Sequence, residues 1–593
     1  MIRRSLFFGV LIVLGVLLYL NPNFKTISAG IAILLFGMIM LEEGFKVFTK
    51  GPLQNILKKA TNKLYKSITT GAFVTALIQS SSLVSVITIS FISAELITLA
   101  GGIGLIFGSN IGTTATAWLV AGFGLKVKVS ALAMPMLVFG VIFSFQKKTA
   151  LKGIGNILAG LGFFFLGIHY MKEGFDVFKE YVDLSQYAVS GFLGVFIYAG
   201  LGIIITTILQ SSSATLALIL TALSVGQIEY ENALALAVGA NIGTTITAVL
   251  GSLSSNVAGK RLAGAHLIFN MTTGIIAISL IFPLARLVDN LSYVFEISNT
   301  NYTLKLALFH TIFNVIGVIV MIPFIKILER LLLRLIKDKD HKEISEPKYL
   351  NPAVLKFPGA VISALINESK YLYEKSVFEI VAHALNIHRE DIKSEEKLKK
   401  VIKKSNIDLK TNVDDLYYNK VKIIYGEIIK YASTAQSTLS LNNRQVIAIT
   451  DIKIANRKMV EIIKDVRELN KNITRVLNLE NKYLQKEYDG YRKKLTKVLR
   501  VIYLFRTENN AKKYELQLEE LKHEAKVNIR KSNKSIDKLI RKNLITAEMA
   551  SSLFNDYANV NDMIKKLIDV AELLYSKKDS LLEESSGNEN TTE

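Results

Sequence analysis

The chain contains no cysteine, so disulfide bridges and thiolate metal sites are excluded. It also lacks a P-loop and any nucleophile–base or metallohydrolase spacing, which argues against a nucleotide-driven pump and against an enzyme. Acidic residues are scarce in the first part, where residues 1–335 hold 12 Asp and Glu. A carboxylate-lined proton path is therefore absent from its most apolar stretches.

Two unlike parts make up the 593 residues, which are 50% hydrophobic yet carry a formal charge of +21. Residues 1–335 hold 23 Lys and Arg, whereas the remainder holds 48 together with 38 Asp and Glu. We predict an all-α protein with a membrane domain over 1–335, a linker over 336–352, a soluble helical domain over 353–580 and a disordered tail over 581–593. Basic residues beside membrane spans explain the excess charge without a nucleic-acid partner.

A duplicated motif organises the membrane part. Gln79-Ser80-Ser81-Ser82 returns 131 residues later as Gln210-Ser211-Ser212-Ser213. In both copies an Asn-Ile-Gly-Thr-Thr segment follows, with Asn110 or Asn241 placed 31 residues after the Gln. This register predicts an internal duplication. We place repeat 1 at about 27–145 and repeat 2 at about 153–285, followed by a last span at about 303–327.

Each Gln-Ser-Ser-Ser motif interrupts an apolar stretch, with about ten apolar residues on either side. A helix rises about 1.5 Å per residue, so each flank spans roughly half of a bilayer. The pattern predicts two re-entrant hairpins or broken helices with polar tips near the midplane, where irregular backbone must be enclosed by protein or by a water-filled cavity. Such duplicated interruptions are typical of a secondary transporter's binding site.

Equivalent loops of the two repeats differ in charge. Glu43-Gly44-Phe45 precedes a Lys-rich loop, whereas Glu173-Gly174-Phe175, at an offset of 130, lies in a slightly acidic one. Because basic loops stay in the cytoplasm, the two loops belong on opposite faces, which predicts inverted-topology repeats. We expect a multi-pass protein of the cytoplasmic (inner) membrane, embedded in its lipid bilayer, with a cytoplasmic N-terminus and C-terminal domain.

The final two spans share a second motif, His266-x-x-Phe269-Asn270 and His310-x-x-Phe313-Asn314. The His and Asn at i and i+4 share one helix face. We interpret this motif as interhelical hydrogen bonding, with a proton relay as the alternative.

Uncharged polar groups are the available chemistry in the hairpins. Hydroxyl and backbone N–H donors at a helix N-terminus suit an anion, and amide, hydroxyl and carbonyl oxygens suit a small hard cation. A bound cation supplies the positive charge that the hairpins lack, which couples the two ligands as symport requires. The alternative is that Ser and Thr only permit close helix packing.

These paired motifs resemble the type II sodium–phosphate cotransporters over about residues 27–327. The resemblance implies phosphate contacts from Ser80, Ser81, Ser82, Ser211, Ser212 and Ser213. It implies sodium sites from Gln79, Gln210, Asn110, Thr113, Thr114, Asn241, Thr244 and Thr245. The sequence departs from animal members at Leu83-Val84, where they continue with further Ser or Thr.

Pro347-Lys348-Tyr349-Leu350 leads into a long helical region, which contains Glu461-Ile-Ile-Lys-Asp465. In these features the soluble part is similar to the C-terminal PhoU-like domain of bacterial members of this family, whose helices bear Glu-x-x-x-Asp. That likeness implies a metal at Glu461, Asp465 and Asp562, with a solvated helix face as the alternative. It also implies a cytoplasmic regulatory protein as a partner.

We predict a sodium-coupled importer of inorganic phosphate with no cofactor beyond the transported ions. The alternatives are another oxyanion, export, or a phosphate-sensing regulator. A homo-oligomer stays open.

Overall fold

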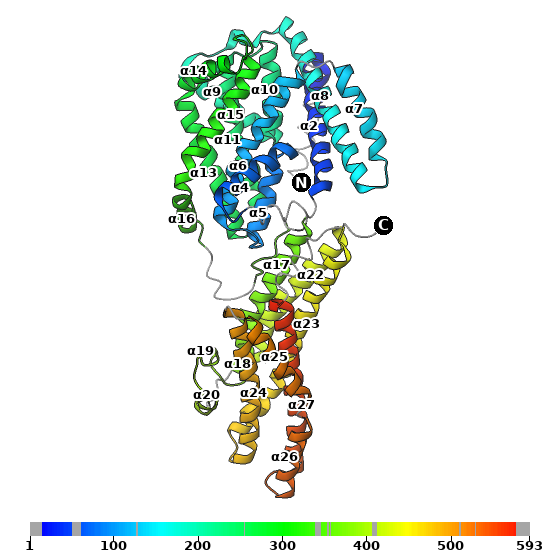
Figure 1. Ribbon diagram of the computed structural model, residues 1–593, viewed down its shortest axis with the longest axis vertical. Helices are drawn as coiled ribbons and strands as arrows, with labels where there is room; N and C mark the ends of the chain where they lie inside the picture. The colour runs from blue at the N-terminus through cyan, green and yellow to red at the C-terminus, as the bar shows by residue number, and fades with distance from the viewer. Residues whose placement is uncertain are drawn as a thin grey trace. The chain divides into compact units, whose positions relative to one another are not determined.

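The protein is helical throughout, as the computed structural model in Figure 1 shows. The structure describes residues 15–49, 61–125, 129–253, 255–337, 346–352, 355, 357–405, 412–508, 511–527 and 529–576. It is 86% helical, and the described ranges contain no strand, which confirms the all-α prediction. The chain divides into two compact units, Met1–Asp338 and Lys339–Glu593, called here the membrane unit and the soluble unit.

The membrane unit contains seven helical segments long and apolar enough to cross a bilayer among the described residues, together with four shorter apolar ones. Its helices are α2 (Pro22–Thr49), α4 (Leu64–Ile78), α5 (Ser81–Ser93), α6 (Leu99–Trp118), α7 (Val129–Ser144), α8 (Thr149–Tyr181), α9 (Gly191–Leu209), α10 (Ser212–Ser224), α11 (Tyr230–Gly243), α12 (Thr245–Ser252), α13 (Val257–Ser279), α14 (Ile281–Val294), α15 (Tyr302–Met321) and α16 (Ile325–Leu335).

Helices α2 and α8 pack against each other through glycines. A Cβ added at Gly37 would lie 2.5 Å from the Phe164 backbone nitrogen and 2.7 Å from the Gly160 carbonyl. Nearer the start of α2, a Cβ added at Gly30 would lie 2.9 Å from the Gly167 carbonyl, which is later in α8 than Gly160. Contacts that advance along α2 therefore retreat along α8, so the two helices are antiparallel.

This contact is symmetric with respect to the repeat offset of 130. A Cβ added at Gly44 would lie 2.7 Å from Cγ1 of Ile157. At the equivalent positions, a Cβ added at Gly174 would lie 2.7 Å from Cγ1 of Ile27. Equivalent helices that run antiparallel and exchange equivalent contacts are the geometry of an inverted repeat.

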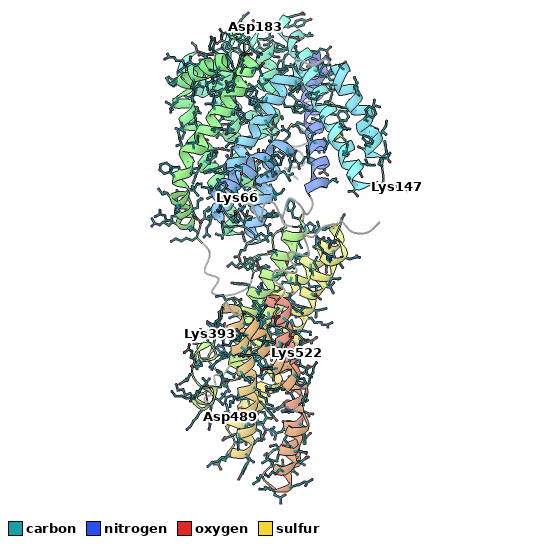
Figure 2. All side chains as sticks on the ribbon, viewed as in Figure 1. Lys66, Lys147, Asp183, Lys393, Asp489 and Lys522 are labelled. Atoms are coloured by element: carbon teal, nitrogen blue, oxygen red, sulfur yellow. The ribbon has the colours of Figure 1, made fainter. Side chains whose placement is uncertain are left out.

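The charged loops agree with this inversion. In Figure 2, Lys66 and Lys147 lie toward one end of the membrane unit, and Asp183 lies at its opposite end. The loops that the sequence analysis contrasted by charge are thus on opposite sides of this unit.

Close backbone approaches also hold each hairpin to the helix that follows it. In repeat 1, a Cβ at Gly108 of α6 would lie 1.9 Å from the Ile68 carbonyl of α4. The equivalent Gly239 of α11 would lie 2.0 Å from the Ala199 carbonyl of α9. Small residues that allow such approaches are the usual means of helix association in membranes.

The helical region at the end of repeat 2, which we place at about 153–285, is divided. Here α13 ends at Ser279 and α14 begins at Ile281. Pro283 explains the division, because it lacks the N–H that would bond to the Ser279 carbonyl of a continuous helix. Proline is tolerated within the first turn of a helix, where N–H groups have no intrahelical acceptor.

The soluble unit is a bundle of long helices. Its elements are α17 (Pro358–Leu372), α18 (Phe378–Ala384), α19 (Arg389–Lys393), α20 (Leu398–Lys404), α21 (Val413–Leu416), α22 (Lys422–Thr438), α23 (Asn443–Leu477), α24 (Lys482–Thr507), α25 (Ala511–Val527), α26 (Ile529–Arg541) and α27 (Ala547–Ala571). The predicted tail over 581–593 lies outside the described residues, and so do residues 1–14 at the start of the predicted membrane domain.

The α2–α8 contact can be tested with Gly37→Ala. Overpacking of this kind typically costs about 1–3 kcal/mol, so we expect a lower melting temperature in detergent. Gly200→Ala in α9 is the matched control, because no atom lies within 4 Å of its added Cβ. There the higher helix propensity of Ala should leave the melting temperature equal or higher. Equal melting temperatures for both variants would contradict the packing described here.

Candidate ion-binding site

Each Gln-Ser-Ser-Ser motif forms the turn between two short helices. Gln79 ends α4 with φ 58° and ψ 25°, and Gln210 ends α9 with φ 54° and ψ 22°. Left-handed backbone at the end of a helix usually belongs to Gly or Asn, because a larger side chain adds strain. Such strain in two equivalent Gln residues points to a function of the side chain. The depth of these turns in a bilayer stays a prediction.

The following helices begin identically. The Ser80 hydroxyl accepts a hydrogen bond from the Leu83 N–H at 3.2 Å, and the Ser211 hydroxyl accepts one from the Ala214 N–H at 3.2 Å. These N-caps start α5 and α10 at the motif itself. The first turn of each helix therefore places N–H groups and the positive end of the helix dipole beside the serines.

The Asn-Ile-Gly-Thr-Thr segments present oxygen rather than hydrogen. Thr113 and its equivalent Thr244 each donate their hydroxyl proton to a carbonyl of their own helix, at 2.8 Å and 3.0 Å. Thr114 and Thr245 do the same, at 2.7 Å and 2.8 Å. Because a hydroxyl has one proton, these side chains are left with oxygen lone pairs, the groups that a hard cation prefers.

The two repeats exchange equivalent contacts across the site. The Thr116 hydroxyl of α6 lies 3.1 Å from the Ser213 hydroxyl of the second motif. The Ser82 hydroxyl of the first motif lies 3.5 Å from the hydroxyl of Thr247, which is the equivalent of Thr116. Each motif is thus held against the segment that follows the other motif, which brings together residues separated by 97 and 165 positions.

One hydroxyl connects both motif copies. Thr116 Oγ1 also lies 2.7 Å from Gln79 Oε1, which can only accept. The Thr116 proton therefore goes to Gln79, and Thr116 accepts from Ser213.

The predicted residues differ in exposure. The buried ones are Asn110, Thr113, Thr114, Ser212, Ser213, Asn241, Thr244 and Thr245. The first motif and Ser211 are half-buried, and Gln210 is exposed within the unit. Thr116 and Thr247 are absent from the residues predicted from the sequence, although both lie 37 residues after their Gln, which is a detectable sign.

The interhelical hydrogen bonding predicted for the His-x-x-Phe-Asn motifs is confirmed for their asparagines. Asn314 of α15 accepts a hydrogen bond from the Asn241 side chain at 3.1 Å, and Asn270 of α13 donates one to the Asn241 carbonyl at 3.1 Å. Both bonds join different helices.

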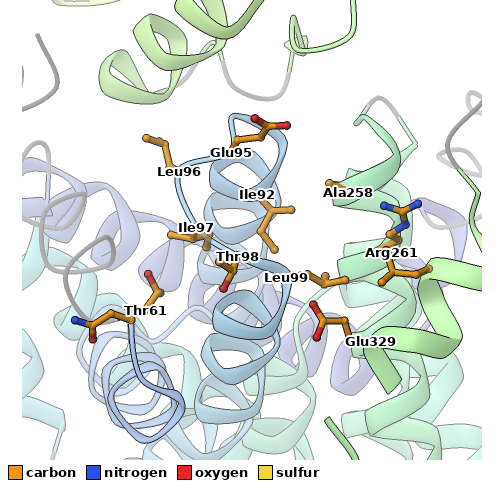
Figure 3. A pocket seen from close by; sticks show the side chains of 12 residues that line it. Thr61, Ile92, Glu95, Leu96, Ile97, Thr98, Leu99, Ala258, Arg261 and Glu329 are labelled. Carbon is orange, nitrogen blue, oxygen red and sulfur yellow. The ribbon is translucent and has the colours of Figure 1, made fainter. Parts of the chain in front are cut away.

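A separate cavity of about 460 Å³ lies in the membrane unit away from these residues. Figure 3 shows Glu95, Arg261 and Glu329 around it, and none of the predicted site residues lines it. It is lined by Thr61, Asn62, Ile92, Glu95, Leu96, Ile97, Thr98, Leu99, Ala258, Arg261, Glu329 and Leu333.

Comparison with known proteins agrees with the geometry. Residues 33–173 and 187–322 match the Na+/Pi-cotransporter family. These two segments cover most of the membrane unit, which is therefore similar to this family. No solved structure matches the chain.

Relatives in this family carry different names. The chain is 26% identical over 343 residues to Putative inorganic phosphate export protein YjbB of Salmonella typhimurium, covering 57% of this chain and 61% of that protein. It is 28% identical to Uncharacterized protein YqeW of Bacillus subtilis, over 53% of this chain and 98% of that protein. It is 38% identical over 114 residues to Sodium-dependent phosphate transport protein 2C of Mus musculus, 18% of either chain.

In the soluble unit, the predicted metal ligands surround a lysine. Lys566 Nζ lies 2.7 Å from Asp465, 2.8 Å from Asp562 and 3.6 Å from Glu461. Burial opposes the Lys566 charge, but its hydrogen bonds to the two aspartates outweigh this and raise the pKa of the ammonium. The described residues contain no group of three or more His, Cys, Asp or Glu that could hold a metal ion. The geometry therefore favours an ion-pair cluster over the predicted metal.

A buried carboxylate holds the segment that enters the soluble unit. Glu368 of α17 is fully buried and accepts a hydrogen bond from the Tyr349 N–H at 2.6 Å. Burial raises the pKa of Glu368 to about 7, although backbone N–H groups of Tyr349, Lys348 and Leu350 act in the opposite direction.

This carboxyl should make the soluble unit less stable as the pH rises. The folded state keeps the proton up to a pH of about 7, whereas the unfolded chain loses it near 4.5. Stability should fall between these values and level off above them, by on the order of 3 kcal/mol. Glu368→Gln keeps an acceptor for Tyr349 and should remove this slope from thermal unfolding of the full-length protein. Glu427→Gln, at a side chain that is 45% exposed, is the control and should keep the slope. An unchanged slope in Glu368→Gln contradicts the assignment.

Proposed function

We propose that the protein is a sodium-coupled symporter that imports inorganic phosphate across the cytoplasmic membrane. The observation that carries this proposal is the Thr116 hydroxyl, which connects Gln79 of one motif with Ser213 of the other. A group proposed for sodium and a group proposed for phosphate thereby share one hydrogen-bonded position.

Phosphate would bind between the two serine runs. The N-termini of α5 and α10 offer hydroxyls, backbone N–H groups and a positive dipole end. The phosphate contacts we propose are Ser80, Ser81, Ser82, Ser211, Ser212 and Ser213, to which the geometry adds Thr116 and Thr247.

Sodium would bind to oxygens of the same region. The proposed ligands are Gln79, Gln210, Asn110, Thr113, Thr114, Asn241, Thr244 and Thr245, all of which are neutral. A dianion among neutral groups lacks compensating charge, and taking it out of water unpaired is costly. A sodium ion bound beside it offsets that cost, so each ligand favours binding of the other. This mutual dependence is the physical basis of the proposed coupling.

Export is the second candidate, because one relative is named as a phosphate export protein. The residues of the site serve either direction, since flux through a symporter follows the combined gradients. The soluble unit, with Lys566 in place of a metal, is proposed to face the cytoplasm and to contact a regulatory protein there.

The direct test is uptake of labelled phosphate into proteoliposomes with an inward, an outward or no sodium gradient. Accumulation driven by the inward gradient supports import by symport. Uptake that is the same with and without a sodium gradient would overturn the proposed coupling. Uptake that occurs only with the outward sodium gradient would favour export. Sulfate and arsenate in place of phosphate test the choice of oxyanion.

Replacing Gln79 by Gly separates folding from function. Gly relieves the strain of the left-handed backbone, so the free energy of unfolding should increase by up to about 1 kcal/mol. The melting temperature should therefore rise. The lost amide should raise the sodium concentration that gives half-maximal uptake by about tenfold. Glu296→Gly is the matched control, because Glu296 has φ 54° in the same unit but lies outside the site. Unchanged sodium dependence in Gln79→Gly would remove Gln79 from the proposed ligands.

A further inference from the structure

The duplicated His-x-x-Phe-Asn motif lies outside the two repeats' signature segments, yet its members are deeply buried. His266 and Asn270 of α13 and His310 and Asn314 of α15 are each at most 3% exposed. Buried polar side chains in a membrane unit are costly unless they are hydrogen-bonded or bind a ligand. Their contacts therefore indicate what they serve.

The interhelical contacts of both asparagines converge on Asn241. The Asn241 side-chain N–H donates to Asn314 Oδ1 at 3.1 Å. The Asn270 amide donates to the Asn241 backbone carbonyl at 3.1 Å and lies 3.1 Å from His266 Nε2. The Asn314 amide in turn donates to the His310 carbonyl of its own helix at 2.8 Å. Two helices thus hold one residue of the second signature segment.

The equivalent residue of repeat 1 is held differently. Asn110 donates its side-chain N–H to the Ile106 carbonyl, one turn back in its own helix, at 2.9 Å. In both copies the side-chain amide nitrogen donates a hydrogen bond, to the Ile106 carbonyl from Asn110 and to Asn314 Oδ1 from Asn241. The amide oxygen of each asparagine therefore points away from that acceptor. Asn110 obtains this orientation locally, whereas Asn241 obtains it from α15.

Packing does not require the asparagines. The ring of Phe269 stacks on Phe107 of α6 with centroids 4.2 Å apart, so the motif's aromatic residue provides that contact. Asn270 Oδ1, by contrast, is buried with no hydrogen-bond partner. A buried carbonyl oxygen without a partner is unfavourable, and a nearby bound cation would remove that cost.

We propose that Asn314 and Asn270 are positioning residues that orient Asn241 for binding of the transported sodium ion. This inference rests on the proposed function. It places the last two membrane helices in the coupling mechanism and makes the two halves of the site unequal. Sodium binding at the Asn241 side then depends on α13 and α15, whereas binding at the Asn110 side does not.

The test uses the full-length protein and the variants Asn314→Ala and Asn270→Ala. Trp118, the only tryptophan of the chain, donates a hydrogen bond to Thr311 of α15 at 2.9 Å and lies two positions after Thr116. Its fluorescence in a sodium titration reports binding without transport. Sodium-driven phosphate uptake into proteoliposomes is measured beside it.

We expect each variant to raise the sodium concentration at half-saturation about tenfold, the ratio that corresponds to one lost buried hydrogen bond. The phosphate concentration at half-saturation, measured in saturating sodium, should be unchanged. Thr273→Val in α13 is the matched control, because its hydroxyl donates to the Phe269 carbonyl of its own helix at 2.9 Å. It should keep the wild-type sodium value.

A purely structural role predicts another pattern, in which the amount of active protein falls while the sodium value stays constant. That pattern overturns the inference. If an Ala variant fails to fold, Asn314→Ser and Asn270→Ser replace it, and the same shift in sodium value is expected. If the wild-type protein shows no sodium response in either measurement, the proposed function itself fails, which distinguishes the two conclusions.

Discussion

The antiparallel contact of α2 with α8 is the constraint on which the membrane unit depends. Its glycines let two backbones approach within a distance that any side chain would prevent, as the 2.5 Å separation at Gly37 shows. Because the helices are repeat equivalents, their antiparallel packing inverts one repeat relative to the other. Inversion in turn lets each Gln-Ser-Ser-Ser turn meet the segment that trails the other. The pairs Thr116 with Ser213 and Ser82 with Thr247 are the result of that arrangement.

The proposed site consists of neutral groups alone. Threonines that donate their proton to their own helix leave lone pairs for a cation, as Thr113 and Thr244 do. Helix starts at Ser81 and Ser212 leave N–H groups for an anion. Neither proposed ligand would meet a fixed opposite charge there, so each would be the best counter-charge for the other. In a membrane interior this is less costly than a buried lysine or carboxylate that would need pairing whenever the site is empty.

The soluble unit uses the opposite strategy. Its helix α27 is joined to α23 by Lys566, which pairs with Asp465 and Asp562, and to α25 by Lys522, which pairs with Asp569 and Glu572. A covalently attached ammonium is always present, whereas a metal must be acquired. The PhoU likeness implies a metal at Glu461, Asp465 and Asp562, and of these Glu461 and Asp465 lie at i and i+4 on one helix face. Spacing within one helix does not show which side chain of another helix lies opposite, and here it is a lysine.

The sequence alone determined the all-α class, the duplication and the identity of the two signature segments, because a fixed offset of 131 and long apolar runs are properties of the chain order. It could also have included Thr116 and Thr247, which obey the same offset. Only the tertiary structure decided which hydroxyl joins Gln79 to Ser213, and that Asn241 is held by Asn270 and Asn314. These contacts cross from one repeat to the other or to the last two helices. Their partners are chosen by helix packing, whose distances no linear spacing contains.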